Sequence, residues 1–166
     1  MNSRMLLQSI GMRIFCVFGA CLAFALIDAP AKPRHCTFRI HAQANPHDSD
    51  VFSMAGHATS SGKDIAIEKL AWITEHDIAA FSPYPSPDGT FGALFQLDEH
   101  GRVVLDTLSI EHRGRFLFVF VNGRMITNLQ IDKRVSDGKI YIPSGLTAGD
   151  VELMKKDWRP LGQTKR

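Results

Sequence analysis

The C-terminal half of the chain alternates between apolar segments and turn signals. Residues 116–121 are six consecutive apolar residues, Asn-Gly follows at 122–123, and a second predicted strand covers residues 125–131. Asn and Gly tolerate the positive φ angles of a type I′ turn, whose twist suits a β-hairpin. Another turn signal at 137–138 precedes a short alternating segment at 139–142. This pattern predicts three consecutive strands of one antiparallel sheet.

Earlier segments of the chain also show the period-2 pattern of half-buried strands. In residues 37–44, Phe38 and Ile40 fall on one face of the predicted strand. Arg39 and His41 fall on the other face, which we expect to be exposed to solvent. Further strands are predicted at residues 51–54, 63–70 and 90–97.

Two segments share the pattern apolar-Thr-x-x-Asp-apolar, which is typical of a helix start. In these segments Thr74 and Thr147 are the predicted N-caps, and Asp77 and Asp150 complete two capping boxes. The apolar residues on either side of each box form a hydrophobic staple. The first helix is expected to end by Phe81, before a Pro-rich loop. The second is expected to close the domain.

A third helix is predicted from residue 98 to about residue 111, where Val104, Leu105 and Leu108 recur at helical spacing. The predicted order alternates groups of strands with single helices. This order indicates an α+β fold, a single antiparallel sheet with about three helices packed on one face.

The N-terminus has the pattern of an export signal. Arg4 and Arg13 precede an apolar run at residues 14–27, which is shorter than the roughly 20 residues needed to span a bilayer. Small residues favour cleavage before Lys32, and an uncleaved anchor over residues 5–27 is the alternative. We therefore expect an exported chain, periplasmic or secreted.

These observations divide the chain into four predicted parts. They are a signal peptide or anchor at 1–31, a strand and loop region at 32–72, an α+β domain at 73–158 and a polar tail at 159–166. The pattern leaves open whether residues 36–70 join the main sheet.

The charge balance argues against a polyanionic partner. Without residues 1–31, the chain has 17 Lys and Arg against 16 Asp and Glu, and no basic stripe stands out. We therefore expect no nucleic-acid partner, and membrane contact only through an uncleaved N-terminal segment. Outside that segment Cys36 is alone, so no internal disulfide is expected.

Candidate chemistry lies near the start of the predicted domain. His35, Cys36, His41, His47 and His57 could supply metal ligands, but their spacing matches no compact zinc pattern. A nucleophilic Cys36 would need an activating base, and no neighbouring residue in the sequence marks one. A small envelope hydrolase or metal-binding protein that uses these residues is the alternative hypothesis. Our preferred expectation is a chain that binds no metal or cofactor.

Other catalytic patterns are incomplete. Ser144-Gly145 does not fit a Gly-x-Ser-x-Gly elbow, and the adjacent carboxylates of Asp98 and Glu99 point to different sides. No phosphate loop, dinucleotide fingerprint or calcium loop occurs in the sequence. We therefore expect that the chain is not an enzyme.

One succession of motifs resembles a known family. FQLDEHG, a helix, FVFVNGR and SDGKIYIPSGLT are similar to the head subdomain of the first periplasmic domain of SecD, in the SecDF accessory to the Sec translocase. The resemblance covers residues 73–158 and rests on turn and cap residues. The residues at matching places are Phe95, Gly101, Gly114, Asn122, Gly123, Ser144, Gly145 and Thr147.

This resemblance implies a stand-alone exported domain that binds unfolded polypeptide or an envelope partner. SecD also has transmembrane helices and intramembrane acids, which have no counterpart in this sequence. If the hairpin at Asn122, Gly123 and Arg124 or the N-terminal strand lies at a sheet edge, it could accept an extended peptide by strand addition.

Overall fold

The computed structural model describes residues 35–45, 51–57 and 64–162. The predicted export segment, residues 1–31, lies outside the described residues. Within the described part, strands contribute more residues than helices, and there are two α-helices and one short 3-10 helix.

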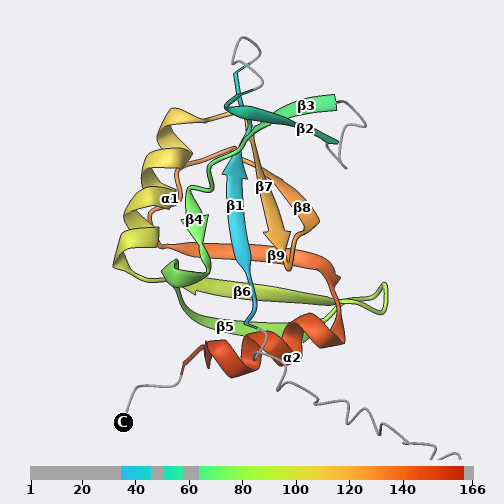
Figure 1. Ribbon diagram of the computed structural model, residues 1–166. Helices are drawn as coiled ribbons and strands as arrows, with labels where there is room; N and C mark the ends of the chain where they lie inside the picture. The colour runs from blue at the N-terminus through green and yellow to red at the C-terminus, as the bar shows by residue number, and fades with distance from the viewer. Residues whose placement is uncertain (1–34, 46–50, 58–63, 163–166) are drawn as a thin grey trace, which may run out of the picture. The chain divides into compact units, whose positions relative to one another are not determined.

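The strands form two four-stranded sheets and a separate hairpin, and the strands of the two large sheets run across each other (Figure 1). The first sheet has the order β4–β1–β7–β8, with bounds Ile73–Thr74, Phe38–Ala42, Phe116–Val121 and Arg124–Gln130. The second has the order β10–β5–β6–β9, with bounds Arg159–Pro160, Ile78–Pro85, Phe91–Leu97 and Lys139–Leu146. The hairpin consists of β2, Ser53–His57, and β3, Asp64–Glu68. All pairings are antiparallel except the short one between β10 and β5.

The predicted mixture of strands and helices is confirmed, but the predicted single sheet is wrong. β9 follows β8 in the chain, yet it pairs with β6, where Ile140 lies opposite Phe95. Pro143 lies within β9 and has no N–H with which to continue a ladder toward β8. The chain therefore leaves the first sheet after β8 and enters the second.

The predicted first helix is also wrong, although its start is formed. Asp77 accepts hydrogen bonds from the N–H and the Oγ1 of Thr74, at 2.7 and 3.1 Å. A single 3-10 turn, Glu75–Asp77, follows, and then the chain becomes β5. From Ile78 on, antiparallel pairing with β6 replaces the helix and places Phe81 opposite Phe95 in the core.

The N-terminal strand belongs to the first sheet. β1 lies between β4 and β7, with Ile40 opposite both Ile73 and Val119. Beyond the end of β4, β3 takes its place beside the chain that follows β1, through a β-bridge between Gln43 and Ile67. β1 is therefore an interior strand, and strand addition along it is excluded by its neighbours.

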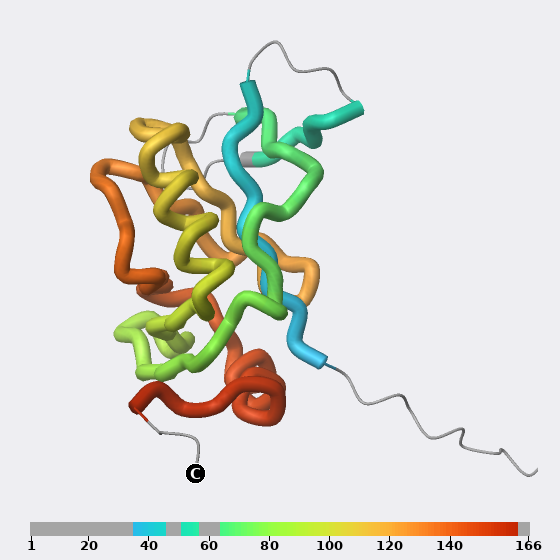
Figure 2. Tube along the Cα trace, turned by 90° about the vertical axis from the view of Figure 1, so that its left-hand side faces the viewer, coloured from blue at the N-terminus to red at the C-terminus, as the bar shows by residue number. Residues whose placement is uncertain are grey.

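Two α-helices complete the described fold. α1, Glu99–Glu111, is capped by Asp98, and α2, Ala148–Asp157, is capped by Thr147. α1 runs alongside β1 and β4, and α2 lies across the end of the domain where β1 begins (Figure 2). The predicted starts of both helices and the predicted end of α1 near residue 111 are confirmed, and the two sheets and two helices share one core.

Aromatic side chains join the sheets to α2. Phe38 of the first sheet and Phe95 of the second have ring centroids 4.8 Å apart, and neither side chain is exposed. Trp158, at the end of α2, makes edge contacts with Phe38, Phe81 and Phe95 at 6.0–6.3 Å. This cluster fixes one sheet against the other.

A second, smaller core lies on the opposite face of the first sheet. Phe118 of β7 packs there with Ile67 of β3, and both are fully buried. His41 on the same face is only 7% exposed, and its Nδ1 donates to the Glu68 carbonyl at 2.8 Å. Burial lowers the pKa of His41. The expected solvent exposure of His41 is wrong, because the β2–β3 hairpin covers this face.

Candidate binding site

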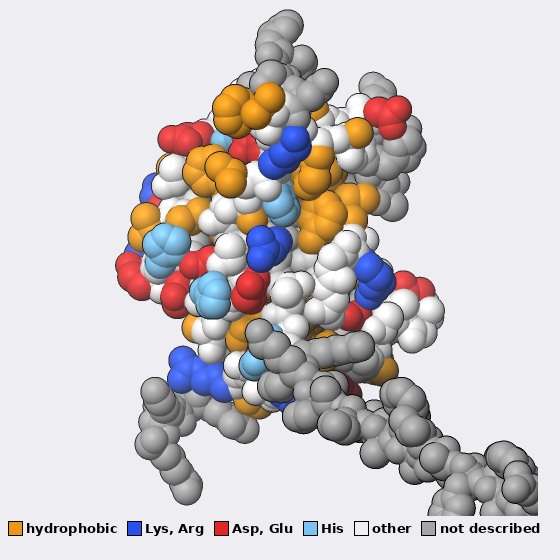
Figure 3. All heavy atoms as spheres, in the orientation of Figure 1, with side chains coloured by type: hydrophobic (Ala, Val, Ile, Leu, Met, Phe, Trp, Pro, Cys, Tyr) orange, Lys and Arg blue, Asp and Glu red, His pale blue; other side chains and the backbone are white. Residues whose placement is uncertain are grey.

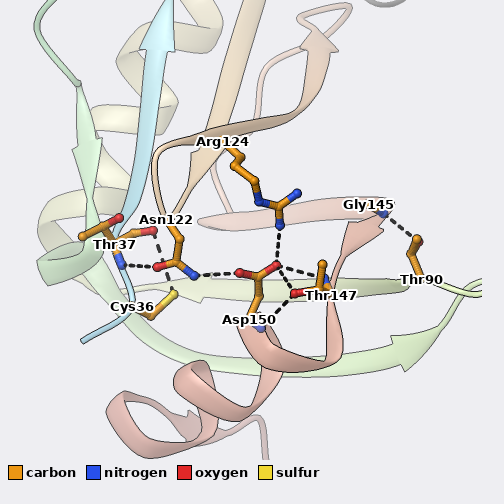
Figure 4. Close-up of polar contacts among 8 residues, drawn as sticks. All are labelled: Cys36, Thr37, Thr90, Asn122, Arg124, Gly145, Thr147 and Asp150. Atoms are coloured by element: carbon orange, nitrogen blue, oxygen red, sulfur yellow. Dashed lines mark hydrogen bonds and ion pairs between the residues drawn. The ribbon is translucent and has the colours of Figure 1, made fainter. Parts of the chain in front are cut away.

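The turn that sequence analysis singled out connects β7 to β8. Asn122 and Gly123 have φ angles of 50° and 76°, as a type I′ turn requires. The Asn122 side chain accepts from the Thr37 N–H at 3.1 Å and donates to Asp150 at 2.7 Å (Figure 4). The turn is thus fastened both to the start of β1 and to α2.

Asp150 is the centre of this arrangement. Its buried carboxylate also accepts from Arg124 Nη2 at 2.6 Å and from the N–H and Oγ1 of Thr147 at 2.9 and 2.7 Å. Burial acts to raise the pKa of Asp150, but the hydrogen bonds from Thr147 and Asn122 and the charge of Arg124 outweigh it and lower this pKa. Asn122 and Arg124 therefore hold the hairpin against α2. A binding role for Asn122, Gly123 and Arg124 stays a prediction.

Cys36 lies beside the same arrangement in an environment that suppresses nucleophilicity. Its side chain is 2% exposed, and its backbone N–H donates to Asp157 at 2.6 Å. Burial, followed by the charges of Asp150, Asp157 and Glu75, raises the pKa of Cys36 to about 12. The thiolate that a nucleophile requires is therefore strongly disfavoured at neutral pH.

The histidines that the structure describes do not gather around Cys36. His35 Nδ1 lies 2.9 Å from Asp157 at one end of β1, whereas His41 bonds to Glu68 toward the other end. His57 ends β2, and its side chain lies outside the described part, as does His47. Among the described residues, the proposed metal ligands thus do not converge.

A different group has its potential ligand atoms within 4.8 Å of one another, namely Asp77, Asp98 and His100. Each carboxylate already accepts a hydrogen bond that stabilises a turn of the chain. Asp98 caps α1 by accepting from the Gly101 N–H at 2.8 Å, and Asp77 closes the box with Thr74. His100 Nδ1 contacts Asp77 at 2.7 Å. These contacts account for the cluster as part of the start of α1.

The free edge of the second sheet is formed by β9. The Leu97 N–H donates to the Gly138 carbonyl at 2.8 Å, which fixes the phase of the β6–β9 ladder. Antiparallel pairs alternate between hydrogen-bonded and non-hydrogen-bonded positions, so Ile140 turns its backbone groups toward β6. Tyr141, one residue on, therefore turns its N–H and C=O toward the open side.

β8 forms an edge of the first sheet, and the same argument applies to it. The Ile131 N–H donates to the Arg115 carbonyl at 2.9 Å, and Leu129 faces Leu117 two residues earlier. Gln130 lies between these positions and turns its backbone groups away from β7. Both sheets therefore present open backbone groups near the same place.

An apolar cavity of about 160 Å³ lies between these two strand ends. Its aliphatic lining consists of Ile40, Leu105, Leu117, Leu129, Ile131, Val135 and Ile140. An apolar cavity of about 150 Å³ is large enough to bind benzene, so this one suits a single large apolar side chain. We call the cavity and the strand ends at residues 129–131 and 139–141 the edge cleft.

The edge cleft is closed at its other end by contact between the two strands. A Cβ placed on Gly145 of β9 would lie 3.0 Å from Ile126 Cγ2 of β8. The strands thus approach closely at Gly145 and separate toward Gln130 and Tyr141, both of which line the cavity. A bound peptide strand could therefore fit between β8 and β9 only near Gln130 and Tyr141.

A second apolar surface surrounds the β2–β3 hairpin. Val51, Phe52 and Leu70 are 71, 68 and 80% exposed, and Trp72 is 38% exposed. Figure 3 shows hydrophobic side chains gathered at the upper end of the view, where Figure 1 places β2 and β3. We call these four residues the apolar tip. Variants at the apolar tip can serve as controls in binding experiments on the edge cleft.

Sequence analysis did not find the edge cleft. Its parts come from β1, α1, β7, β8 and β9, and no local pattern joins them. The one signal available was Val135, a single apolar residue within the polar segment 132–138, which lines the cavity.

Comparison with known proteins finds structural relatives only. No family model and no curated protein sequence matches the chain. A structure of SecDF, described as a membrane component that enhances protein export, matches with a TM-score of 0.54 and 12% identity, over 80% of this chain and 70% of that one. A crystal structure of SecDF in a super-membrane-facing form matches with a TM-score of 0.52 and 12% identity. That match covers 75% of this chain but only 19% of the SecDF chain.

The likeness to SecDF is one of fold. The resemblance stated from sequence motifs is confirmed at that level, because both matches cover most of this chain. Among the described residues, neither helix has the length and apolar composition needed to cross a membrane.

Proposed function

We propose that this chain is an exported, non-enzymatic interaction domain that binds an extended polypeptide segment in the edge cleft, in connection with protein export. One observation carries the proposal. Two edge strands with open backbone groups flank an apolar cavity of about 160 Å³, the size of one large side chain.

The binding mode is strand addition with one anchoring side chain. A segment lying along β9 would pair with the N–H and C=O of Tyr141 and could reach those of Gln130 on the other side. Its inward-facing side chain would enter the cavity, since successive side chains of a strand point to opposite faces. Backbone pairing gives affinity for many sequences, and the cavity requires one apolar residue.

The link to export rests on the SecDF-like fold. SecDF is described as enhancing protein export, a role in which contact with extended chains would be useful. The export-signal pattern at residues 1–31 supports an exported location for this chain. Non-enzymatic character is supported by the burial of Cys36 and its raised pKa, which disfavour the hydrolase alternative.

The first experiment compares two substitutions at one position. Tyr141→Pro removes an N–H on the open side of β9 and leaves the ladder to β6 intact, whereas Tyr141→Ala keeps that N–H. Both lose the ring contact with Tyr84. Binding would be followed by fluorescence anisotropy with a short labelled peptide that has one Phe among Ser, Thr and Gln residues. We expect Tyr141→Pro to weaken binding about tenfold relative to Tyr141→Ala.

A second experiment tests the cavity without altering a strand. Val135→Phe would place a ring toward the cavity, with Leu70→Ser on the apolar tip as the control. We expect loss of peptide binding for Val135→Phe and unchanged binding for Leu70→Ser. Unchanged binding by Val135→Phe together with loss of binding by Leu70→Ser would assign the site to the apolar tip instead. Equal binding by Tyr141→Pro and Tyr141→Ala would contradict strand addition.

A further inference from the structure

We propose that the edge cleft selects apolar segments with an acidic residue directly beside the anchoring side chain. This inference rests on the proposed polypeptide binding and adds its sequence preference. It follows from two lysines at the mouth of the cavity and from the alternation of side chains along β9.

Two lysines line the mouth of the cavity, Lys133 in the segment after β8 and Lys139 at the start of β9. Both are exposed, and within residues 35–45, 51–57 and 64–162 neither forms an ion pair. Asp132 is the one carboxylate among the lining residues. Two lysines against one aspartate give the mouth a net positive charge.

Neighbouring cations are neutralised within the domain. Arg134 contacts Asp106 through two nitrogens at 2.6 and 2.7 Å, and Arg102 contacts Glu99 at 2.6 and 3.0 Å. The two arginines thus have carboxylate partners, whereas the lysines at the mouth are available to a ligand.

The geometry of strand addition places an acidic neighbour against Lys139. On β9, Ile140 points into the cavity, and Lys139 and Tyr141 point to the opposite, exposed face. A bound strand would place its anchor inward beside Ile140. The residues directly before and after the anchor would point outward, beside Lys139 and Tyr141, within reach of a cross-strand pair. Asp or Glu at one of these positions would meet the Lys139 ammonium.

The expected preference is moderate, because the lysines are exposed. One solvent-exposed ion pair corresponds to roughly twofold to fivefold in affinity, and we expect a preference of about this size from each lysine. The preference should shrink as salt is added, since the Debye length falls below about 10 Å above 0.1 M salt.

The test uses the full chain and three labelled peptides that share one central Phe. The residues beside the Phe are acidic in the first, basic in the second and neutral in the third. Binding is measured for the wild type, for Lys133→Glu with Lys139→Glu, and for Arg113→Glu with Lys156→Glu. The last variant makes the same change in net charge at two exposed residues outside the cavity lining.

We expect the wild type and the Arg113/Lys156 variant to bind the acidic peptide most tightly, and the Lys133/Lys139 variant to prefer the basic one. Equal affinity for all three peptides, or a preference that survives charge reversal at Lys133 and Lys139, would overturn this inference and leave the proposed function intact. Failure of the wild type to bind any of the peptides would overturn both.

Discussion

Two segments of this protein begin with the same local motif and continue differently. Thr74 and Asp77 form one capping box, and Thr147 and Asp150 form the other. The second starts α2, ten residues long, whereas the first yields only a three-residue 3-10 turn before β5 begins. In both boxes the Asp carboxylate accepts from the N–H and the Oγ1 of the Thr. The Asp150 N–H also donates to Thr147 Oγ1, at 3.1 Å.

The segments beyond the two boxes decide the outcome. Ile78–Pro85 contains two prolines and pairs with β6 along nearly its whole length, which places Phe81 in the core. After the second box, Val151 and Met154 recur at helical spacing and are buried against the same core. A capping box therefore specifies where the chain turns, and tertiary partners decide whether a helix continues.

The largest expected effect on stability comes from removing the carboxylate of either capping box. Asp150→Ala deprives Asn122, Arg124 and Thr147 of their common acceptor, and we expect it to lower the free energy of unfolding by about 3 kcal/mol. Asp77→Ala should cost about 1.5 kcal/mol, because the Asp77 carboxylate accepts, within the described part of the chain, from Thr74 and His100 alone. Urea denaturation would measure both values. Equal losses would show that the contacts of Asp150 to β8 add nothing to its cap.

Acid should weaken both boxes. Burial acts to raise the pKa of Asp77, but hydrogen bonds from Thr74 and His100 outweigh it and lower this pKa, as the corresponding contacts do for Asp150. A native pKa below the unfolded value of about 3.9 means that each carboxylate stabilises the fold above that pH. The contribution is lost as the pH falls through the native pKa.

Stability curves between pH 3 and pH 7 would show this loss. The curve should be flatter at its acid end in Asp150→Ala and in Asp77→Ala than in the wild type. An unchanged acid limb in both variants would assign the loss to other carboxylates.

A smaller effect separates the two boxes near neutral pH. The hydrogen bond and the charge of Asp77 raise the pKa of His100, whereas the charge partner of Asp150 is an arginine, Arg124. A raised native pKa means that the His100 contact stabilises the fold fully below about pH 6.5 and is lost as the pH rises through the native pKa.

An NMR titration of His100 would measure this effect directly. In Asp77→Asn we expect the pKa of His100 to fall toward its ordinary value, and in Asp150→Asn to stay raised. A raised pKa that persists in Asp77→Asn would exclude Asp77 as its cause.

The smallest effect concerns the isolated segments. A peptide of residues 146–158 should show a little more helix by circular dichroism than one of residues 73–85, because the latter contains Pro83 and Pro85. Both should be mainly unfolded in water, since short isolated helices are marginal. Equal helicity of the two peptides would show that the prolines are not the reason for the difference. Pairing with β6 alone would then explain why residues 78–85 form a strand.

The candidate site shows the same division between local and tertiary information. The turn at Asn122 and Gly123 could be predicted because positive φ angles are a property of those two residues. That Asn122 would bind Asp150, and that β8 would end beside an apolar cavity, could not be predicted. Both depend on residues 28 or more positions apart, or on several strands at once.

The turns, the helix starts and most strand positions could be predicted from local sequence, because they depend on residues within a few positions of one another. Tertiary packing was needed to establish that β9 pairs with β6, that β1 is an interior strand and that the β2–β3 hairpin covers His41. Alternating strands are interchangeable as partners until side-chain packing selects among them. The edge cleft arises from that selection, since it lies where two sheets come together without joining.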